Sequence, residues 1–288
     1  MNKKQIRIII GVIVVWFVAL VAYYVSRSNV QVLNPKGTIA YDERNLIVFT
    51  TILSVFVLLP VFTMTFWIAW KYREGNTKAK YQPDWDHSPA AEVLWWGIPT
   101  LIIVILSVVT WNTSHSLDPH KPLKTGDPLK IQVVALDWKW LFIYPEQKIA
   151  SVNYVQFPVD KPVQFEITSN GPMNSFWIPQ LGGQIYAMAG MSTHLNLEAD
   201  QVGDYRGSSA NISGKGFAGM TFTARASSGT EFNSWVIGAQ SSASRLDMNS
   251  YEVLAKPSEN YPPAIYASAE PGLYNKIQAR FQLPGGGE

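Results

Sequence analysis

The sequence of 288 residues contains no cysteine and few charged side chains. Without cysteine, the chain cannot form disulfide bonds, thiolate metal sites or a thiol nucleophile. Charged residues make up 15% of the chain, well below the roughly 25% of ordinary soluble proteins. The net charge of +2 argues against a nucleic-acid-binding protein, which would concentrate basic residues on one face. Hydrophobic residues reach 47%, which excludes a disordered chain.

The apolar residues are concentrated in three runs that contain no charge. These runs cover residues 8–25, 46–70 and 93–111, or 18, 25 and 19 residues. A helix needs about 20 apolar residues to cross the hydrocarbon core of a bilayer, with about 17 as the lower limit. Pro60 and Pro99 lie inside the second and third runs, where a membrane helix tolerates proline better than a soluble core helix does. We predict a transmembrane hairpin over residues 26–111, with spans at 46–70 and 93–111.

The first run, within residues 1–25, has two interpretations. Lys3, Lys4 and Arg7 followed by an apolar stretch describe either a secretory signal peptide or an uncleaved signal-anchor helix. The run ends in Ala19-Leu20-Val21-Ala22, which lacks the small residue that signal cleavage requires three positions before the cut. This favours a retained third transmembrane helix, with cleavage as the alternative.

Basic residues in the connections predict the orientation. The segment before the first run and the loop between the second and third runs are both basic; the loop contains Lys71, Arg73, Lys78 and Lys80. Cytoplasmic connections carry such an excess of lysine and arginine. With three spans, the positive-inside rule places everything after Trp111 on the outer side of the membrane.

The pattern changes to an alternation of period two in the outer part of the chain. Val163, Phe165 and Ile167 alternate with polar residues, and so do Leu195 and Leu197. Short alternating segments separated by Gly, Pro and Asn turns are typical of an antiparallel sandwich or barrel. We therefore expect an outer β domain over residues 112–226. Beyond it, Phe232, Trp235 and Val236 fall at helical spacing, which predicts a helical or irregular C-terminal tail over residues 227–288.

No residue set in the sequence has the spacing of a catalytic or metal site. No two of the four histidines share an element at ligand spacing, so we interpret them as solvated side chains rather than metal ligands; they are His87, His115, His120 and His194. No nucleophile elbow and no phosphate-binding glycine loop is present. We therefore expect no metal site and no catalytic residue in this chain.

Two local features each allow a structural and a functional interpretation. Trp138 and Trp140 belong to a segment rich in aromatics, which suits a sheet core by default and a docking face against another membrane subunit as the alternative. Glu92 stands immediately before the third apolar run. It either stabilises a helix N-terminus or collects protons at the membrane surface, and the residues alone favour the first.

The chain resembles subunit II of the haem–copper respiratory oxidases, in particular the bo-type ubiquinol oxidases. The resemblance runs from about residue 32 to about residue 257. It rests on five segments: Leu33–Gly37, Trp70–Arg73, Asp137–Trp140, Tyr144–Gln147 and the long Met173–Met191. It implies a membrane α-helical anchor with two or three transmembrane helices, followed by an all-β cupredoxin-like sandwich.

In the cytochrome c oxidase branch of this family, the sandwich holds a binuclear copper centre. The resemblance places residues of other chemistry at most of the ligand positions, namely Asn174, Ser209, Asn211, Ser213 and Phe217, and leaves only Met220 unchanged. A serine hydroxyl cannot replace a bridging thiolate at neutral pH. The copper site is therefore expected to be absent, and Met220 to be a core residue.

The loss of the copper site implies a quinol donor rather than cytochrome c. The resemblance then implies that this chain carries no cofactor and that haems, copper and quinol belong to partner subunit I. It also implies further small membrane subunits and a bacterial cytoplasmic membrane location with the large domain on the periplasmic side. A glutamate at the position of Glu92 lies at the mouth of a proton channel in this family, which favours the proton-entry interpretation.

One departure concerns the N-terminus. Bo-type relatives often carry a lipidated N-terminal cysteine, which this chain cannot have. Two alternatives to the quinol oxidase subunit remain: a copper-carrying electron-transfer subunit, which the missing ligands disfavour, and a membrane-anchored cupredoxin-like assembly factor that does not join the mature oxidase.

Overall fold

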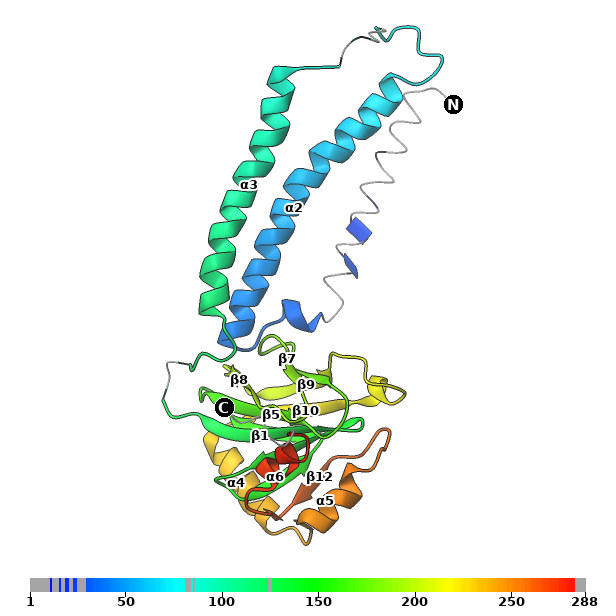
Figure 1. Ribbon diagram of the computed structural model, residues 1–288. Coiled ribbons are helices and arrows are strands. Elements are labelled where there is room, and N and C mark those ends of the chain that lie inside the picture. The colour runs from blue at the N-terminus through cyan, green and yellow to red at the C-terminus, as the bar shows by residue number, and fades with distance from the viewer. Residues whose placement is uncertain are drawn as a thin grey trace. The chain divides into compact units, whose positions relative to one another are not determined.

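The computed structural model describes residues 30–80, 84, 86–123 and 126–282, together with six isolated positions before residue 25. The chain forms two compact units (Figure 1). One unit combines residues 1–44 with residues 122–288, and the other covers residues 45–121. The predicted first helix falls within residues 1–25, which lie outside the described residues apart from those isolated positions.

Two long apolar helices make up the hairpin of the chain. Helix α2 spans Thr38–Lys71 and contains Pro60, and helix α3 spans Pro89–Ser116 and contains Pro99. Both are long and apolar enough to cross a membrane, and no residue in the apolar window of either helix is buried by the rest of the chain. A 34-residue helix measures about 51 Å, against about 30 Å of hydrocarbon. Its first two turns, which carry Asp42 and Glu43, therefore need not enter the apolar layer.

The outer domain is built from two stacked β-sheets. The first sheet has six strands in the order β12-β3-β2-β1-β5-β8, and the second has five in the order β4-β10-β9-β6-β7. Strand bounds in the first sheet are β1 Leu129–Leu136, β2 Lys139–Tyr144, β3 Ile149–Val152, β5 Val163–Ser169, β8 Thr193–Leu197 and β12 Ala264–Tyr266. In the second they are β4 Tyr154–Pro158, β6 Asn174–Trp177, β7 Ile185–Ala187, β9 Gly203–Ser209 and β10 Thr221–Ser227.

Alternation along the strands decides which side chains enter the core between the sheets. Val163, Phe165 and Ile167 of β5 are buried, whereas Gln164 and Glu166 are only partly covered. β5 runs parallel to β1 and antiparallel to β8, so that apolar residues of all three strands line one face. The predicted fold class, a helical membrane anchor followed by an all-β sandwich, is confirmed.

The segment after residue 227 forms helices that cover the sandwich. Helix α4 spans Gly229–Gln240 and begins with a capping box between Ser228 and Glu231. The short elements that follow are β11 Arg245–Leu246, α5 Met248–Ala255, β13 Ser268–Ala269 and α6 Leu273–Ala279. The predicted helix around Phe232 and Trp235 is present as α4. The packing of the rest could not be foreseen, because its elements are too short to show a period.

A second hydrophobic core lies on the outer face of the six-stranded sheet. That face is formed by Val134, Leu136, Leu141, Ile143, Ala150 and Val152, and it packs against Leu246, Tyr251, Leu254, Leu273, Tyr274 and Ile277 of the C-terminal elements. In addition, β12 pairs with β3 and extends the sheet. Both faces of β2 are thus covered, and all six of its residues are buried.

The start of α2 is fastened to the sandwich through backbone contacts. The Lys36 amide donates to the Gln180 carbonyl at 2.7 Å, and the Asp200 amide donates to the Lys36 carbonyl at 3.0 Å. A Cβ on Gly37 would lie 2.2 Å from the Glu198 carbonyl oxygen, so only glycine fits there. These contacts explain the Leu33–Gly37 segment as an attachment point of the outer domain.

Candidate functional site

The loop between β9 and β10 contains most of the positions at which the resemblance noted above places copper ligands of the cytochrome c oxidases. Ser209 is buried, and its hydroxyl lies 3.0 Å from Asn174 Oδ1 and 3.2 Å from the Asn211 carbonyl. The side-chain amide of Asn211 donates through Nδ2 to the Met173 carbonyl at 2.8 Å. The structure therefore brings Asn174, Ser209 and Asn211 together as a network of neutral hydrogen bonds that closes this end of the sandwich.

The remaining three positions point to packing rather than ligation. Met220 is fully buried in the core between the sheets, and Phe217 is half-buried in the 3-10 turn Phe217–Gly219. The Ser213 carbonyl accepts a hydrogen bond from the Trp138 indole at 3.3 Å. Within the described part of the chain, no group of three His, Cys, Asp or Glu side chains could hold a metal ion.

The two tryptophans of the aromatic segment have different environments. Trp140 is fully buried and lies edge-on to Phe176 and Phe222, with ring centroids 5.3 and 5.9 Å away. The docking interpretation is therefore wrong for Trp140, because its side chain has no exposed surface. Trp138 lies in the turn before β2 with a φ of 63° and is only half-buried.

Trp138 packs on the β9–β10 loop. A Cβ on Gly216 would lie 2.4–2.7 Å from three atoms of the Trp138 indole. The ring therefore needs glycine beneath it. Because the exposed part of the ring borders this loop, a docking role for Trp138 stays a proposal.

Residues 256–263, here called the C-terminal strap, hold the same end of the domain. The ammonium of the fully buried Lys139 donates to the Lys256 carbonyl at 2.8 Å and to the Ser258 hydroxyl at 2.6 Å. Glu259 forms an ion pair of 3.0 Å with Lys215 of the β9–β10 loop. The strap thus connects the turn at Trp138 with the loop that contains Ser213.

Burial lowers the pKa of the Lys139 ammonium below its usual value of 10.5, and the charge of Asp137 opposes this shift. A buried ammonium is stable only when hydrogen bonds replace its hydration. Its two nearer acceptors here belong to the strap, the Asp137 carbonyl lies 3.5 Å away, and the ring of Tyr261 lies 5.3 Å from the ammonium. This role of Lys139 could not be predicted from the sequence, because lysine is rarely buried.

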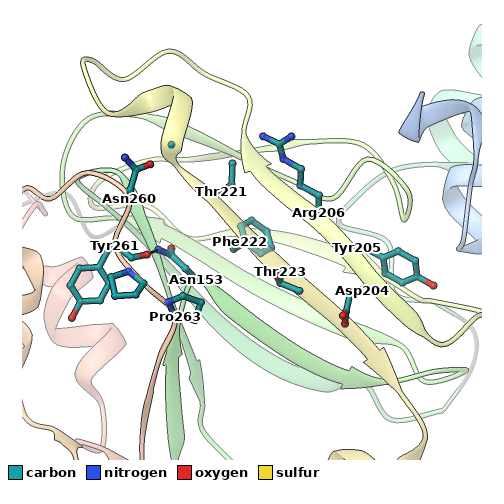
Figure 2. A pocket seen from close by; sticks show the side chains of 12 residues that line it. Asn153, Asp204, Tyr205, Arg206, Thr221, Phe222, Thr223, Asn260, Tyr261 and Pro263 are labelled. Atoms are coloured by element: carbon teal, nitrogen blue, oxygen red, sulfur yellow. Dashed lines mark hydrogen bonds between the residues drawn. The ribbon is translucent and has the colours of Figure 1, made fainter. Parts of the chain in front are cut away.

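A groove of about 500 Å³ runs along the outer face of β9 and β10, beside the strap (Figure 2). Threonine, asparagine and arginine side chains line it, together with Tyr261 and two prolines of the strap. Its one carboxylate, that of Asp204, lies 3.8 Å from Arg225. The described residues that line the groove include no histidine.

Glu92 lies in the first turn of α3, in the other unit of the chain. Ser88 has the extended conformation of an N-cap residue and Pro89 occupies the first helical position, which is where proline fits best. The Glu92 amide donates to the Ser88 carbonyl at 3.0 Å. Its carboxylate lies near the positive end of the helix dipole, which stabilises the charge.

His87 contacts Glu92 directly. Its Nδ1 lies 2.6 Å from Glu92 Oε1, and the two side chains are 65% and 35% exposed. The sequence interpretation treated all four histidines as solvated and missed this pair. Pro89 was the available signal, because it marks the helix start that brings residues 87 and 92 together.

Comparisons with known proteins give matches for parts of the chain and for most of its length. A family model described as the COX Aromatic Rich Motif matches residues 240–285, the segment that builds the second core. The periplasmic domain of subunit II of a cytochrome oxidase of Bradyrhizobium japonicum is similar in structure, with 24% identity and a TM-score of 0.38. That similarity covers 40% of this chain and 95% of the solved one.

Three curated relatives match most of the sequence. The cytochrome bo(3) ubiquinol oxidase subunit 2 of Pseudomonas aeruginosa is 48% identical over 271 residues, which cover 94% of this chain and 82% of the relative. The ubiquinol oxidase subunit 2 of Acetobacter aceti is 50% identical over 90% of this chain and 85% of the relative. The quinol oxidase subunit 2 of Bacillus subtilis is 41% identical over 84% of this chain and 76% of the relative. The chain therefore belongs to the family of subunit 2 of the bo3-type ubiquinol oxidases.

Proposed function

We propose that this chain is a subunit of a proton-pumping quinol:oxygen oxidoreductase and carries no redox centre of its own. Family membership supports the quinol oxidase assignment. The observation that carries the second part is the network of Asn174, Ser209 and Asn211, which occupies the copper-ligand region with neutral groups. Electrons then pass from quinol to haems and copper in subunit I, and this chain supports that subunit.

The copper-carrying alternative makes a different prediction for metal content. In the purified oxidase, we expect no copper beyond that of subunit I, because serine and asparagine oxygens are poor ligands for the copper that thiolates and imidazoles bind. Metal analysis normalised to haem, together with the spectrum of a mixed-valence binuclear copper, measures this. Copper bound to the isolated chain would contradict the proposal, and a chain purified without haem partners would favour the assembly factor.

The chain has two helices that are long and apolar enough to cross a membrane, and its relatives are subunits of a membrane oxidase. We propose the bacterial cytoplasmic membrane, with the outer domain on the periplasmic side, because α2 ends at Lys71 and the connection to α3 contains Arg73, Lys78 and Lys80. The partners proposed are subunit I, further small membrane subunits and the lipid bilayer, and neither cytochrome c nor nucleic acid.

For Glu92 we propose a role in proton entry from the cytoplasm. Its carboxylate lies in the first turn of α3, just before the apolar run of that helix, and its side chain is only 35% exposed. We expect Glu92→Gln to lower quinol oxidase turnover about tenfold, because the amide preserves shape and polarity but cannot take up and release a proton. Oxygen consumption by the assembled enzyme, with haem content as the control for assembly, measures the effect. Turnover equal to that of the parent would contradict the proposal.

A further inference from the structure

The contact between His87 and Glu92 joins a solvent-facing imidazole to a less exposed carboxylate. The 2.6 Å separation of His87 Nδ1 and Glu92 Oε1 is within hydrogen-bonding distance. Exposure falls from 65% at His87 to 35% at Glu92. A proton moving from the imidazole to the carboxylate therefore moves from water toward the apolar part of the helix.

Stability alone does not account for this pair. An ion pair with one largely exposed partner contributes little to folding, and the start of α3 is already fixed by Pro89 and by the bond from the Glu92 amide to the Ser88 carbonyl. Imidazole is the side chain that gains and loses a proton near neutral pH, and its two nitrogens allow it to accept on one side and donate on the other. The pair has the chemistry of a proton relay.

We propose that His87 is a positioning and proton-relay residue for Glu92. This inference rests on the proposed role of Glu92 in proton entry. A proton from water adds to Nε2 of the neutral imidazole and gives imidazolium. The Nδ1 proton then passes to Glu92 Oε1, leaving neutral imidazole and a protonated carboxyl group. After Glu92 releases its proton inward, the imidazole returns to its first tautomer and the pair is reset.

Other charged groups of the same connection contribute to its pH dependence. Asp84 and Asp86 precede His87 and are exposed, and Glu74, Lys78 and Lys80 lie earlier in the connection. The acidic side chains attract protons to this part of the surface, whereas the lysines repel them. Glu92 is the group whose contact with His87 the described residues show.

The test compares four variants in the assembled, purified oxidase over a range of pH: His87→Gln, His87→Ala, Glu92→Gln and His115→Gln. His115 is the control, because it lies in the last turn of the same helix, where its ring centroid is 4.6 Å from that of Trp111. We expect His87→Gln to lower turnover roughly tenfold at alkaline pH, where protons are scarce, and less at acidic pH. The expected tenfold loss is smaller than the ~10²-fold or more that an acid–base group supplies at a reacting bond. It is smaller because water can still deliver protons to Glu92 without His87. Added imidazole should restore the turnover of His87→Ala. The turnover of His115→Gln should depend on pH as that of the parent does in the same buffer.

Three outcomes would overturn the relay. If Glu92→Gln lowers turnover but His87→Gln has the turnover of the parent, Glu92 takes protons directly from water. A loss in His87→Ala that is equal at every pH and insensitive to imidazole would show a structural role. Parental turnover in both Glu92→Gln and His87→Gln would remove proton entry at Glu92 and the relay with it.

Discussion

Deletion of residues 241–288 is expected to prevent stable folding of the outer domain. The deletion removes the six large side chains that cover the outer face of the six-stranded sheet, among them Tyr251, Leu254 and Ile277. Loss of one such buried side chain costs about 2–5 kcal/mol, and the whole free energy of unfolding of a domain is about 5–15 kcal/mol. The uncovered face would also lose strand β12 and expose β3 as an edge, which favours aggregation.

The measurement is the amount of each chain, parent or shortened, that is found in membranes and the resistance of its outer domain to protease. A chain that stops after Gln282 is the matched control, because it retains every described residue of the second core. Ile277→Asp gives an intermediate test, since it buries one uncompensated carboxylate where the side chain is fully enclosed. Normal amounts of protease-resistant, assembled protein after the long deletion would show that the second core is dispensable.

The membrane helices and the core strands could be predicted from the sequence because their signals are local. Runs such as 46–70 need only length and absence of charge, and the alternation from Val163 to Ile167 needs only neighbours in sequence. The second core could not be predicted in this way. Its helices, such as Met248–Ala255, are short, and the surface they cover comes from strands more than 90 residues earlier in the chain.

Trp138 and Trp140 lie two residues apart, yet their environments differ. Residues two apart in a strand point to the same side, but β2 begins only at Lys139, and Trp138 has a left-handed backbone in the turn. One indole is therefore enclosed while the other packs on the β9–β10 loop. The loss of the copper ligands, by contrast, could be predicted without any knowledge of the fold. Residue identity alone decides whether a thiolate or an imidazole is present.

Lys139→Ala is expected to destabilise the outer domain by about 4 kcal/mol. The substitution leaves the part-buried Lys256 carbonyl and Ser258 hydroxyl without their donor, at about 1 kcal/mol for each, the low end for an unsatisfied group, and it adds a cavity that costs about 2 kcal/mol. Lys139→Met should cost less, about 2 kcal/mol, because it fills the cavity and removes a buried charge. Urea unfolding of the detergent-solubilised chain measures both, and Lys256→Met, which changes an exposed side chain, should stay within about 0.5 kcal/mol of the parent.

The lowered pKa of Lys139 adds a dependence on pH whose sign can be stated. Because the folded pKa lies below the unfolded value of 10.5, the unfolded chain binds more protons between the two values. The Lys139 contribution to the free energy of unfolding therefore rises with pH across the window just below 10.5. Buried tyrosines such as Tyr274, whose pKa burial raises to about 12, act in the opposite direction at higher pH, but equally in parent and variant. The stability difference between parent and Lys139→Met should thus shift in favour of the parent as pH rises through this window. A difference that stays constant with pH would show that the Lys139 ammonium titrates alike in the folded and unfolded chains.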